Sequence, residues 1–406
     1  MEARSVKPRH SAFQAWEVVP AVLVLVGFAA WAEGALAYLR PLDFGLAYRA
    51  GVAAWDSGHP EQLRTWMSTP VLAAVMAIVS RVAPLSAAIV AMTVLNLGLT
   101  VGLLAVVGRG LRDVLPRAAW WGSLAVAALF TPLISTVLFK QFNLVVLVLG
   151  VAGFAAVRRG HHRTGAALTA LGLCLKPIAV LTPFAFLAWR DTRKAGAWTI
   201  LWGAGLTAAA QLFLAWRAAD AAVLNPLPAF ATFSKRTAPW VCHEENFSPR
   251  GMLCRLAGDE SWPLGPVFAL AGVLLLMVLA REALRGYEGR SWETYAFVCL
   301  LSPMLGPVAW THYQLFLAPM LLVLVRGFAV RGAHWTLWAG LLFSVGLASL
   351  VVRPFGTIPG GIEFLLSGRD NETLKDAFRV MAVSQFAQYF LFLVACRAVP
   401  AFRAAS

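Results

Sequence analysis

Residues 85–108 read LSAAIVAMTVLNLGLTVGLLAVVG, a run of 24 residues without a single charged side chain. A helix needs about 20 apolar residues to cross the hydrocarbon core of a bilayer, so this run is long enough to span a membrane. The segment that follows, RGLRDVLPR at 109–117, is strongly basic. Because apolar runs and short polar loops alternate in this way along the whole chain, the sequence predicts an all-α, polytopic membrane protein.

The composition agrees with this fold class. Of the 406 residues, 59% are hydrophobic and 13% are charged, whereas about a quarter of the residues in a soluble domain are charged. We predict one integral-membrane domain over 1–406 with about 12 transmembrane helices, near 16–38, 85–108, 118–137, 142–157, 164–176, 177–189, 195–216, 263–282, 292–308, 313–327, 334–352 and 379–397. Several of these segments are short, so some helices are expected to end inside the membrane, where irregular backbone needs protein or a wet cavity around it.

The charge pattern excludes some functions and orients the chain. The net charge is +14, but the basic residues are scattered between apolar segments, so we expect no nucleic-acid partner. Short loops rich in Lys and Arg face the cytoplasm. This rule places the protein in a bacterial plasma membrane with both termini on the cytoplasmic side. The outside loops are then 39–84, 217–262 and 353–378, which carry 12 of the 20 acidic residues. This orientation requires 70–83 to be a surface or re-entrant helix.

The first outside loop begins with an amphipathic pattern. Phe44, Tyr48, Gly51 and Trp55 recur at spacings of four, three and four, which is one stripe of a helix suited to lying flat at the membrane interface. Asp43 stands at the N-terminal end of this helix, where the helix dipole stabilises negative charge. Two interpretations of Asp43 remain open, a helix cap and a functional carboxylate.

Polar residues interrupt the apolar runs at two places. Two apolar segments are separated by a short polar stretch that contains Lys140, Gln141 and Asn143. The apolar run from 165 to 189 is interrupted by Lys176-Pro177. A Lys near the middle of a membrane helix costs about 3 kcal/mol on insertion scales and usually faces a cavity or a partner. Lys176 therefore either reaches the surface from a short helix end or provides a cation for a lipid phosphate.

The later outside segments contain further candidates. Asn246 and Arg255 lie in the large loop, which is either an ordinary solvated loop or part of a site. Cys242 and Cys254 share that loop, where oxidation is permitted, so we predict a disulfide between them, with two free thiols as the alternative. A second break includes Trp310 and His312; this His is either an interfacial anchor or a group that binds phosphate or polarises a hydroxyl opposite Asp43.

The order of these motifs resembles that of glycosyltransferase family 87, of the GT-C superfamily, which includes polyprenol-phosphate-mannose-dependent α-1,2-mannosyltransferases. The resemblance covers nearly the whole chain and rests on these motifs: Asp43-Phe44 with Tyr48, the segment from Pro70, Gln141-Phe-Asn143, Gly165 through Lys176-Pro177, Asn246-Phe-Ser248 with Arg255, and Ser302-Pro303 through Trp310-Thr-His312. Two departures stand out. Lys140 occupies a position where the family often has Gly, and Ser68-Thr69-Pro70 replaces an aromatic-Pro-Pro stretch.

The resemblance implies sugar transfer from a polyprenyl phosphate to a lipid-linked or glycan acceptor on the extracytoplasmic side. It implies that Asp43 is the base and that His312 and Lys176-Pro177 match family positions. The chemistry needs a base near the acceptor hydroxyl and donors for the leaving phosphate. We assign catalytic roles to Asp43 and His312. The phosphate-binding candidates are Lys176, Gln141, Arg255 and Lys140, and the substrate-binding candidates are Tyr48, Asn143, Asn246 and Trp310.

The predicted reaction is inverting single displacement of a hexose, which the family likeness implies to be mannose. We expect membrane lipids around the protein and no cofactor or metal ion. No Walker loop, dinucleotide fingerprint or HExxH motif occurs in the sequence. The alternatives are an arabinofuranosyl or glucosyl transferase of the same superfamily and a lipid or solute transporter. Transporters place polar residues near the midplane and have repeated halves. This sequence has no repeat, and its polar residues gather at the outside boundary, which favours the enzyme.

Overall fold

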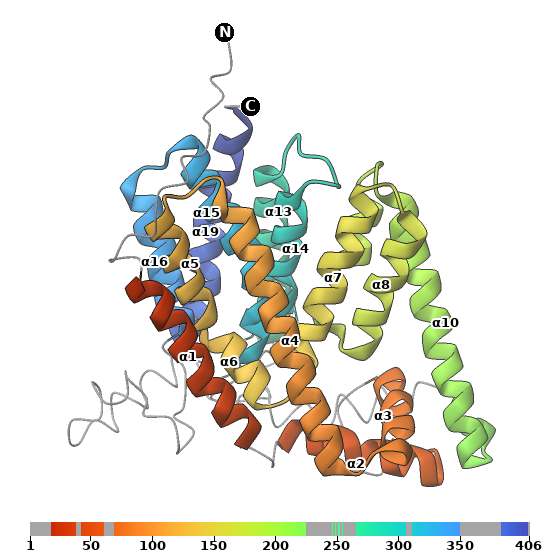
Figure 1. Cartoon of the computed structure of the whole chain (residues 1–406). Coiled ribbons are helices and arrows are strands. Elements are labelled where there is room, and N and C mark those ends of the chain that lie inside the picture. Colours follow the sequence, from red (N-terminus) through yellow and green to blue (C-terminus); the bar gives the residue numbers. More distant parts are fainter. Residues whose placement is uncertain are drawn as a thin grey trace.

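The computed structural model describes residues 18–37, 42–60, 69–224, 246, 248, 251, 254, 265–305, 311–349 and 383–404. In this part of the chain the regular elements are all helices (Figure 1). Those at the predicted apolar segments are α1 (Val18–Ala37), α4 (Leu85–Arg112), α5 (Arg117–Ala128), α6 (Thr131–Leu138), α7 (Asn143–Arg158), α8 (His162–Leu175), η3 (Pro177–Ala179), α9 (Leu181–Ala188), α10 (Arg193–Ala218), α13 (Gly265–Ala283), α14 (Trp292–Leu305), η5 (Thr311–Leu317), α15 (Ala318–Arg331), α16 (Trp335–Ser349) and α19 (Val383–Ala404).

Among the described residues, four helical stretches are long and apolar enough to cross a membrane: Leu85–Arg112, Arg117–Leu138, Arg193–Ala218 and Tyr313–Arg331. Their outward faces are apolar, as Leu201 and Trp202 of α10 illustrate with exposed fractions of 60% and 46%. The chain is therefore an all-helical membrane protein. The number of about 12 crossings stays a prediction, because other apolar helices are shorter.

Three of the predicted segments are divided where the sequence supplies a reason. The segment 118–137 is split between α5 and α6, because Phe130 is extended and Pro132 lies in the first turn of α6, where a missing N–H costs no hydrogen bond. The segment 177–189 begins as the 3₁₀ helix η3 after Pro177. The segment 313–327 likewise begins as the 3₁₀ helix η5. These irregular starts place backbone turns at one end of the helix layer.

The basic loops gather at the opposite end, at the top of Figure 1, where α4 is joined to α5, α7 to α8, α9 to α10 and α13 to α14. Hydrogen bonds tie these loops together. The Asp191 carboxylate accepts the backbone N–H groups of Gly289 and Arg290 at 3.1 and 3.0 Å, and the Arg290 guanidinium donates to the Asp191 carbonyl at 3.1 Å. The segments that the charge rule assigns to one side of the membrane therefore meet at one end of the molecule.

Two helices form a hairpin at the other end. Figure 1 shows α2 (Leu42–Ser57) lying across the lower ends of the other helices, with α3 (Pro70–Val82) beside it. The 13 residues of α3 extend about 20 Å, less than the ~30 Å of a bilayer core. This length agrees with the expectation that 70–83 is not a complete crossing.

The stripe of α2 packs against other helices, and the location of α2 at the membrane interface stays a prediction. Phe44 is buried, and the Tyr48 hydroxyl donates to the carbonyl of Ala83 at the end of α3, at 2.8 Å. The guanidinium of Arg217 in α10 lies over the ring of Trp55, 4.8 Å from the centroid of that ring. The stripe therefore fixes α2 to α3 and α10, because these contacts offer both burial and hydrogen bonds that lipid lacks.

Small residues bring α7 and α8 into close contact. A Cβ added at Gly153 of α7 would lie 2.8 Å from the carbonyl oxygen of Gly165 of α8, closer than real Cβ contacts. Paired glycines let helix backbones approach in membrane proteins. Since α7 and α8 are joined by a short loop and run in opposite directions, the start of α7 lies beside the end of α8, where Lys176 follows.

We predict that Gly51→Ala destabilises the protein, because a Cβ at Gly51 would collide with the backbone of Met76 in α3. Overpacking of this kind costs about 1–3 kcal/mol, which thermal unfolding of the detergent-purified protein should detect. Gly45→Ala on the same helix is the control, because a Cβ there meets nothing within 4 Å. Equal melting temperatures for the two variants would contradict the close packing of α2 against α3.

Candidate active site

Three of the predicted site residues meet in one hydrogen-bonded cluster. Asp43 lies in the first turn of α2, and its carboxylate accepts a hydrogen bond from the Gln141 side-chain amide. The Gln141 carbonyl oxygen in turn accepts from the Lys176 ammonium at 2.6 Å. We call Asp43, Gln141 and Lys176 the polar cluster. It joins segments that lie 98 and 35 residues apart in the sequence.

The Gln141 side chain is positioned by the way α6 ends. The Gln141 N–H bonds to the Thr136 carbonyl at 2.9 Å and the Lys140 N–H bonds to the Val137 carbonyl at 3.1 Å, which is the Schellman pattern of a helix C-terminus. Lys140 has a φ of 54°, in the left-handed region where glycine is favoured. This conformation explains physically why a Gly suits the position and why Lys140 is a departure.

Lys140 makes a structural contact with α1. Its side chain is completely buried, and its ammonium donates to the Ala35 carbonyl of α1 at 2.6 Å. Burial lowers the pKa of Lys140 to about 8. The bond to α1 offsets part of the ~1–2 kcal/mol that a left-handed backbone costs a residue with a Cβ. Lys140 therefore holds the α6–α7 turn against α1.

Tyr313 was given no role by sequence reasoning, although it directly follows His312. It lies in η5, with the Lys176 ammonium 4.6 Å from its ring centroid, within the range of a cation–π interaction. The signal for it was present in the sequence as an aromatic residue beside the predicted boundary His. The ring of Phe44 stacks on that of Phe142 with a centroid distance of 6.2 Å, so the residues that follow Asp43 and Gln141 in the sequence also contact each other.

Two predicted substrate-binding residues make local structural bonds. The Tyr48 hydroxyl is directed to the end of α3, as described above. Asn246 is fully buried, and its side-chain oxygen accepts the Ser248 N–H at 3.0 Å, an arrangement that stabilises turns. Asn143 is also fully buried and begins α7, two residues after Gln141. A role for Asn143 beside the polar cluster stays a prediction.

Several predictions fall outside the described residues. They concern Arg255, Trp310, Cys242 and the side chain of His312, whose backbone is the second residue of η5. Cys254 is described and is disulfide-bonded, while Cys174, Cys299 and Cys396 are free. The pairing of Cys254 with Cys242 stays a prediction. Among the described residues, no group of three His, Cys, Asp or Glu side chains is arranged to hold a metal ion.

The polar cluster brings a carboxylate and an ammonium together at a helix end. The Asp43 residue is exposed and Lys176 is partly buried, so a carboxylate can be reached from outside while the ammonium stays close to the protein. An ammonium has three N–H donors, so Lys176 can bind Gln141 and an anionic oxygen at the same time. The cluster lies at the start of α7, and the basic loop follows Arg158 at the other end of this helix. Because α7 has 16 residues, its two ends are about 24 Å apart.

Comparisons with known proteins identify the family of this chain. Residues 66–305 match glycosyltransferase family 87, so the chain belongs to this family of glycosyltransferases. It is similar to the polyprenol-phosphate-mannose-dependent α-(1-2)-phosphatidylinositol mannoside mannosyltransferase of Mycobacterium tuberculosis. The two are 28% identical over 336 residues, and the match covers 74% of each chain. No solved structure matches the chain.

We predict that Gln141→Leu lowers both stability and the rate of sugar transfer. The change leaves the Asp43 carboxylate and the Lys176 ammonium without the amide that joins them, and a hydrogen bond to a charged group contributes about 1.5–3 kcal/mol. Thermal unfolding and a transfer assay measure the two effects. Gln211→Leu makes the same change on α10, outside the polar cluster, and should retain the wild-type rate. Equal rates for both variants would show that Gln141 has no part in the site.

Proposed function

We propose that this glycosyltransferase moves mannose from a polyprenyl phosphate to a hydroxyl of a lipid-linked or glycan acceptor. The observation that carries the proposal is the polar cluster, which combines an accessible carboxylate with an ammonium in a membrane protein. The name of the mycobacterial relative supports both the donor and the sugar. A lipid-borne donor also suits a helical membrane protein, because its chain stays in the membrane while its sugar reaches the boundary.

The reaction follows from these groups by single displacement. The acceptor hydroxyl oxygen attacks the anomeric carbon while the bond from that carbon to the phosphate oxygen breaks. The hydroxyl proton passes to the Asp43 carboxylate, and the electron pair of the broken bond stays on the departing polyprenyl phosphate. Lys176 offsets the charge that develops on the phosphate. Attack from the side opposite the leaving group inverts the configuration at the anomeric carbon.

Gln141 has a positioning role in this scheme. Its amide N–H fixes the orientation of the Asp43 carboxylate, and its carbonyl fixes the Lys176 ammonium. The Tyr313 ring holds the same ammonium from another side. His312, one residue before Tyr313, and Arg255 are proposed as further ligands of the leaving phosphate. A preorganised arrangement of this kind needs no reorientation when the charge develops.

We further propose that the polar cluster faces the extracytoplasmic side. The basic loops meet at the opposite end of the molecule (Figure 1), and such loops usually face the cytoplasm. Both termini would then lie in the cytoplasm of a bacterial cell. On this side a soluble nucleotide sugar is absent, which agrees with a donor carried by a lipid.

The activity is tested with synthetic polyprenyl-phosphate mannose and purified protein. We expect Asp43→Asn to lower kcat by roughly 10²–10⁴-fold, the usual contribution of a general base. Asp56→Asn is the matched control, because Asp56 lies at the other end of α2 and pairs with Arg81. Equal turnover by Asp43→Asn and wild type would remove Asp43 from its role. Transfer from a nucleotide sugar alone would overturn the donor class, and transfer of arabinofuranose or glucose alone would overturn the sugar.

The orientation is tested by labelling single cysteines in whole cells after the native cysteines are replaced. We expect Ser57→Cys, at the end of α2, to react with a membrane-impermeant maleimide added outside. His161→Cys, in the exposed loop between α7 and α8, should react only after the cells are opened. The reverse pattern would place the polar cluster on the cytoplasmic side.

A further inference from the structure

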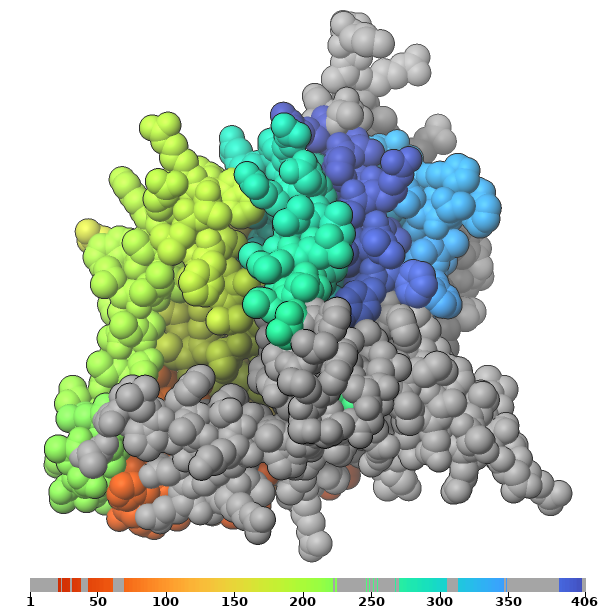
Figure 2. All heavy atoms as spheres, turned by 180° about the vertical axis from the view of Figure 1, so that it is seen from behind, coloured from red at the N-terminus to blue at the C-terminus, as the bar shows by residue number. Residues whose placement is uncertain are grey.

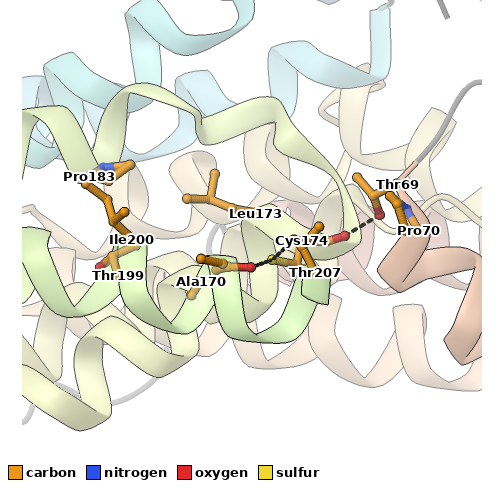
Figure 3. A pocket seen from close by; sticks show the side chains of 11 residues that line it. Thr69, Pro70, Ala170, Leu173, Cys174, Pro183, Thr199, Ile200 and Thr207 are labelled. Atoms are coloured by element: carbon orange, nitrogen blue, oxygen red, sulfur yellow. Dashed lines mark hydrogen bonds between the residues drawn. The ribbon is translucent and has the colours of Figure 1, made fainter. Parts of the chain in front are cut away.

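A groove on the outer side of α8 is separate from the polar cluster. It has a volume of about 480 Å³, within the size range of ligand pockets. Its walls come from α8, α9, α10 and the first residues of α3, as Figure 3 shows. Along α10 it extends from Thr199 to Thr207, eight residues or about 12 Å of helix.

The groove has an apolar surface although threonines and a cysteine line it. The Thr199 hydroxyl donates to the Ala195 carbonyl at 2.8 Å, and the Thr69 hydroxyl donates to the Cys174 carbonyl (Figure 3). The Cys174 thiol lies 3.7 Å from the Gly203 carbonyl. Because these donors already have acceptors within the protein, the groove suits a ligand without hydrogen-bonding groups.

The groove opens at the exposed apolar face of α10 and has several small residues in its lining. Ile200 forms part of its rim and is 47% exposed, next to exposed Leu201 and Trp202. In Figure 2 α10 lies at the edge of the molecule. Ala170, Gly203 and Ala204 line the groove and contribute little or no side chain. Such small side chains leave room in the groove, which a chain with methyl branches needs more than a straight acyl chain does.

An apolar path connects the groove with the polar cluster. Lys176 is followed by Pro177, the first residue of η3, and the Pro177 ring is exposed. Val180 and Phe184 come next along η3 and α9, with exposed fractions of 39% and 60%, and Pro183 between them forms part of the groove. A phosphate held at Lys176 therefore has a hydrocarbon surface leading away from it into the groove.

We propose that this groove binds the isoprenoid chain of the donor, with the first units on η3 and α9 and the following units between α8 and α10. This inference rests on the proposed function, since it assumes a polyprenyl phosphate whose phosphate binds at Lys176. It assigns a binding role to a surface that shares no residue with the polar cluster. It also explains why Gly203, which faces the groove inside a membrane helix, carries no side chain.

The test compares two glycines of α10. A Cβ at Gly203 lies 4.0 Å from the Cys174 sulfur and a Cβ at Gly205 meets nothing within 4 Å, so a side chain can start at both positions without a collision. Of the two, only Gly203 lines the groove. Both changes replace Gly by Leu within one helix, so their effects on helix propensity match. Ala204→Leu, at an exposed position of the groove, is a second filling variant if Gly203→Leu folds poorly.

We expect Gly203→Leu or Ala204→Leu to raise the KM for a long-chain polyprenyl-phosphate mannose about tenfold, which corresponds to a few lost methylene contacts. The KM for a donor with two isoprene units should be unchanged, because its chain ends before the groove. Gly205→Leu should match wild type with both donors.

Equal KM values for Gly203→Leu, Ala204→Leu and Gly205→Leu with the long donor would overturn the proposal. A change confined to the KM of the lipid acceptor would also overturn it, since the groove would then bind an acyl chain. Failure of the wild-type protein to transfer mannose from either donor would instead count against the proposed function, and this outcome is recognised without any substitution.

Discussion

The hydrogen bonds from Asp43 through Gln141 to Lys176 form the interaction on which the site depends. A carboxylate and an ammonium at the edge of an apolar protein each lose hydration, and they recover part of this loss only when a polar partner meets them. The Gln141 amide can serve both, because it donates with its nitrogen and accepts with its oxygen. One neutral side chain thus holds two opposite charges at defined positions without a direct ion pair.

The helix breaks around this cluster have local causes. The α6–α7 turn closes with a Schellman pattern, and it does so through Lys140 in a left-handed conformation. The turn after α8 is fixed by Pro177, whose preceding residue favours extended backbone, as the ψ of 118° at Lys176 shows. Irregular backbone at membrane depth must be surrounded by protein or a cavity, so these breaks and the polar residues occur together.

Close helix packing sets the distance between the turns. The glycine pair of α7 and α8 brings the two helices together, so Gln141 before α7 and Lys176 after α8 meet at one end. On the other side of α2, Gly51 and Tyr48 fix the helix to α3. These contacts position α2 so that Asp43, in its first turn, lies within hydrogen-bond distance of Gln141. The carboxylate and the ammonium therefore come from separate helix pairs, and small residues hold each pair in close contact.

Much of the architecture follows from the sequence alone. Apolar runs such as 85–108, the basic loops and the break at Lys176-Pro177 identify a helical membrane protein with one basic end, because hydrocarbon excludes charge whatever the tertiary arrangement. The motif order also indicates the family, which the match over residues 66–305 confirms. Asp43, Gln141 and Lys176 were each identifiable as polar residues at apolar boundaries.

Only the tertiary structure decided which of these polar residues act together. Lys140 and Gln141 are neighbours in the sequence, yet one ammonium is buried against α1 while the other side chain meets Asp43. The left-handed turn separates them, and no periodic pattern encodes such a turn when glycine is absent. The stripe of α2 likewise predicts an amphipathic helix but not whether lipid or α3 covers it, because both surfaces are apolar. Hydrophobicity determines what leaves water, and packing and directional hydrogen bonds determine which groups meet.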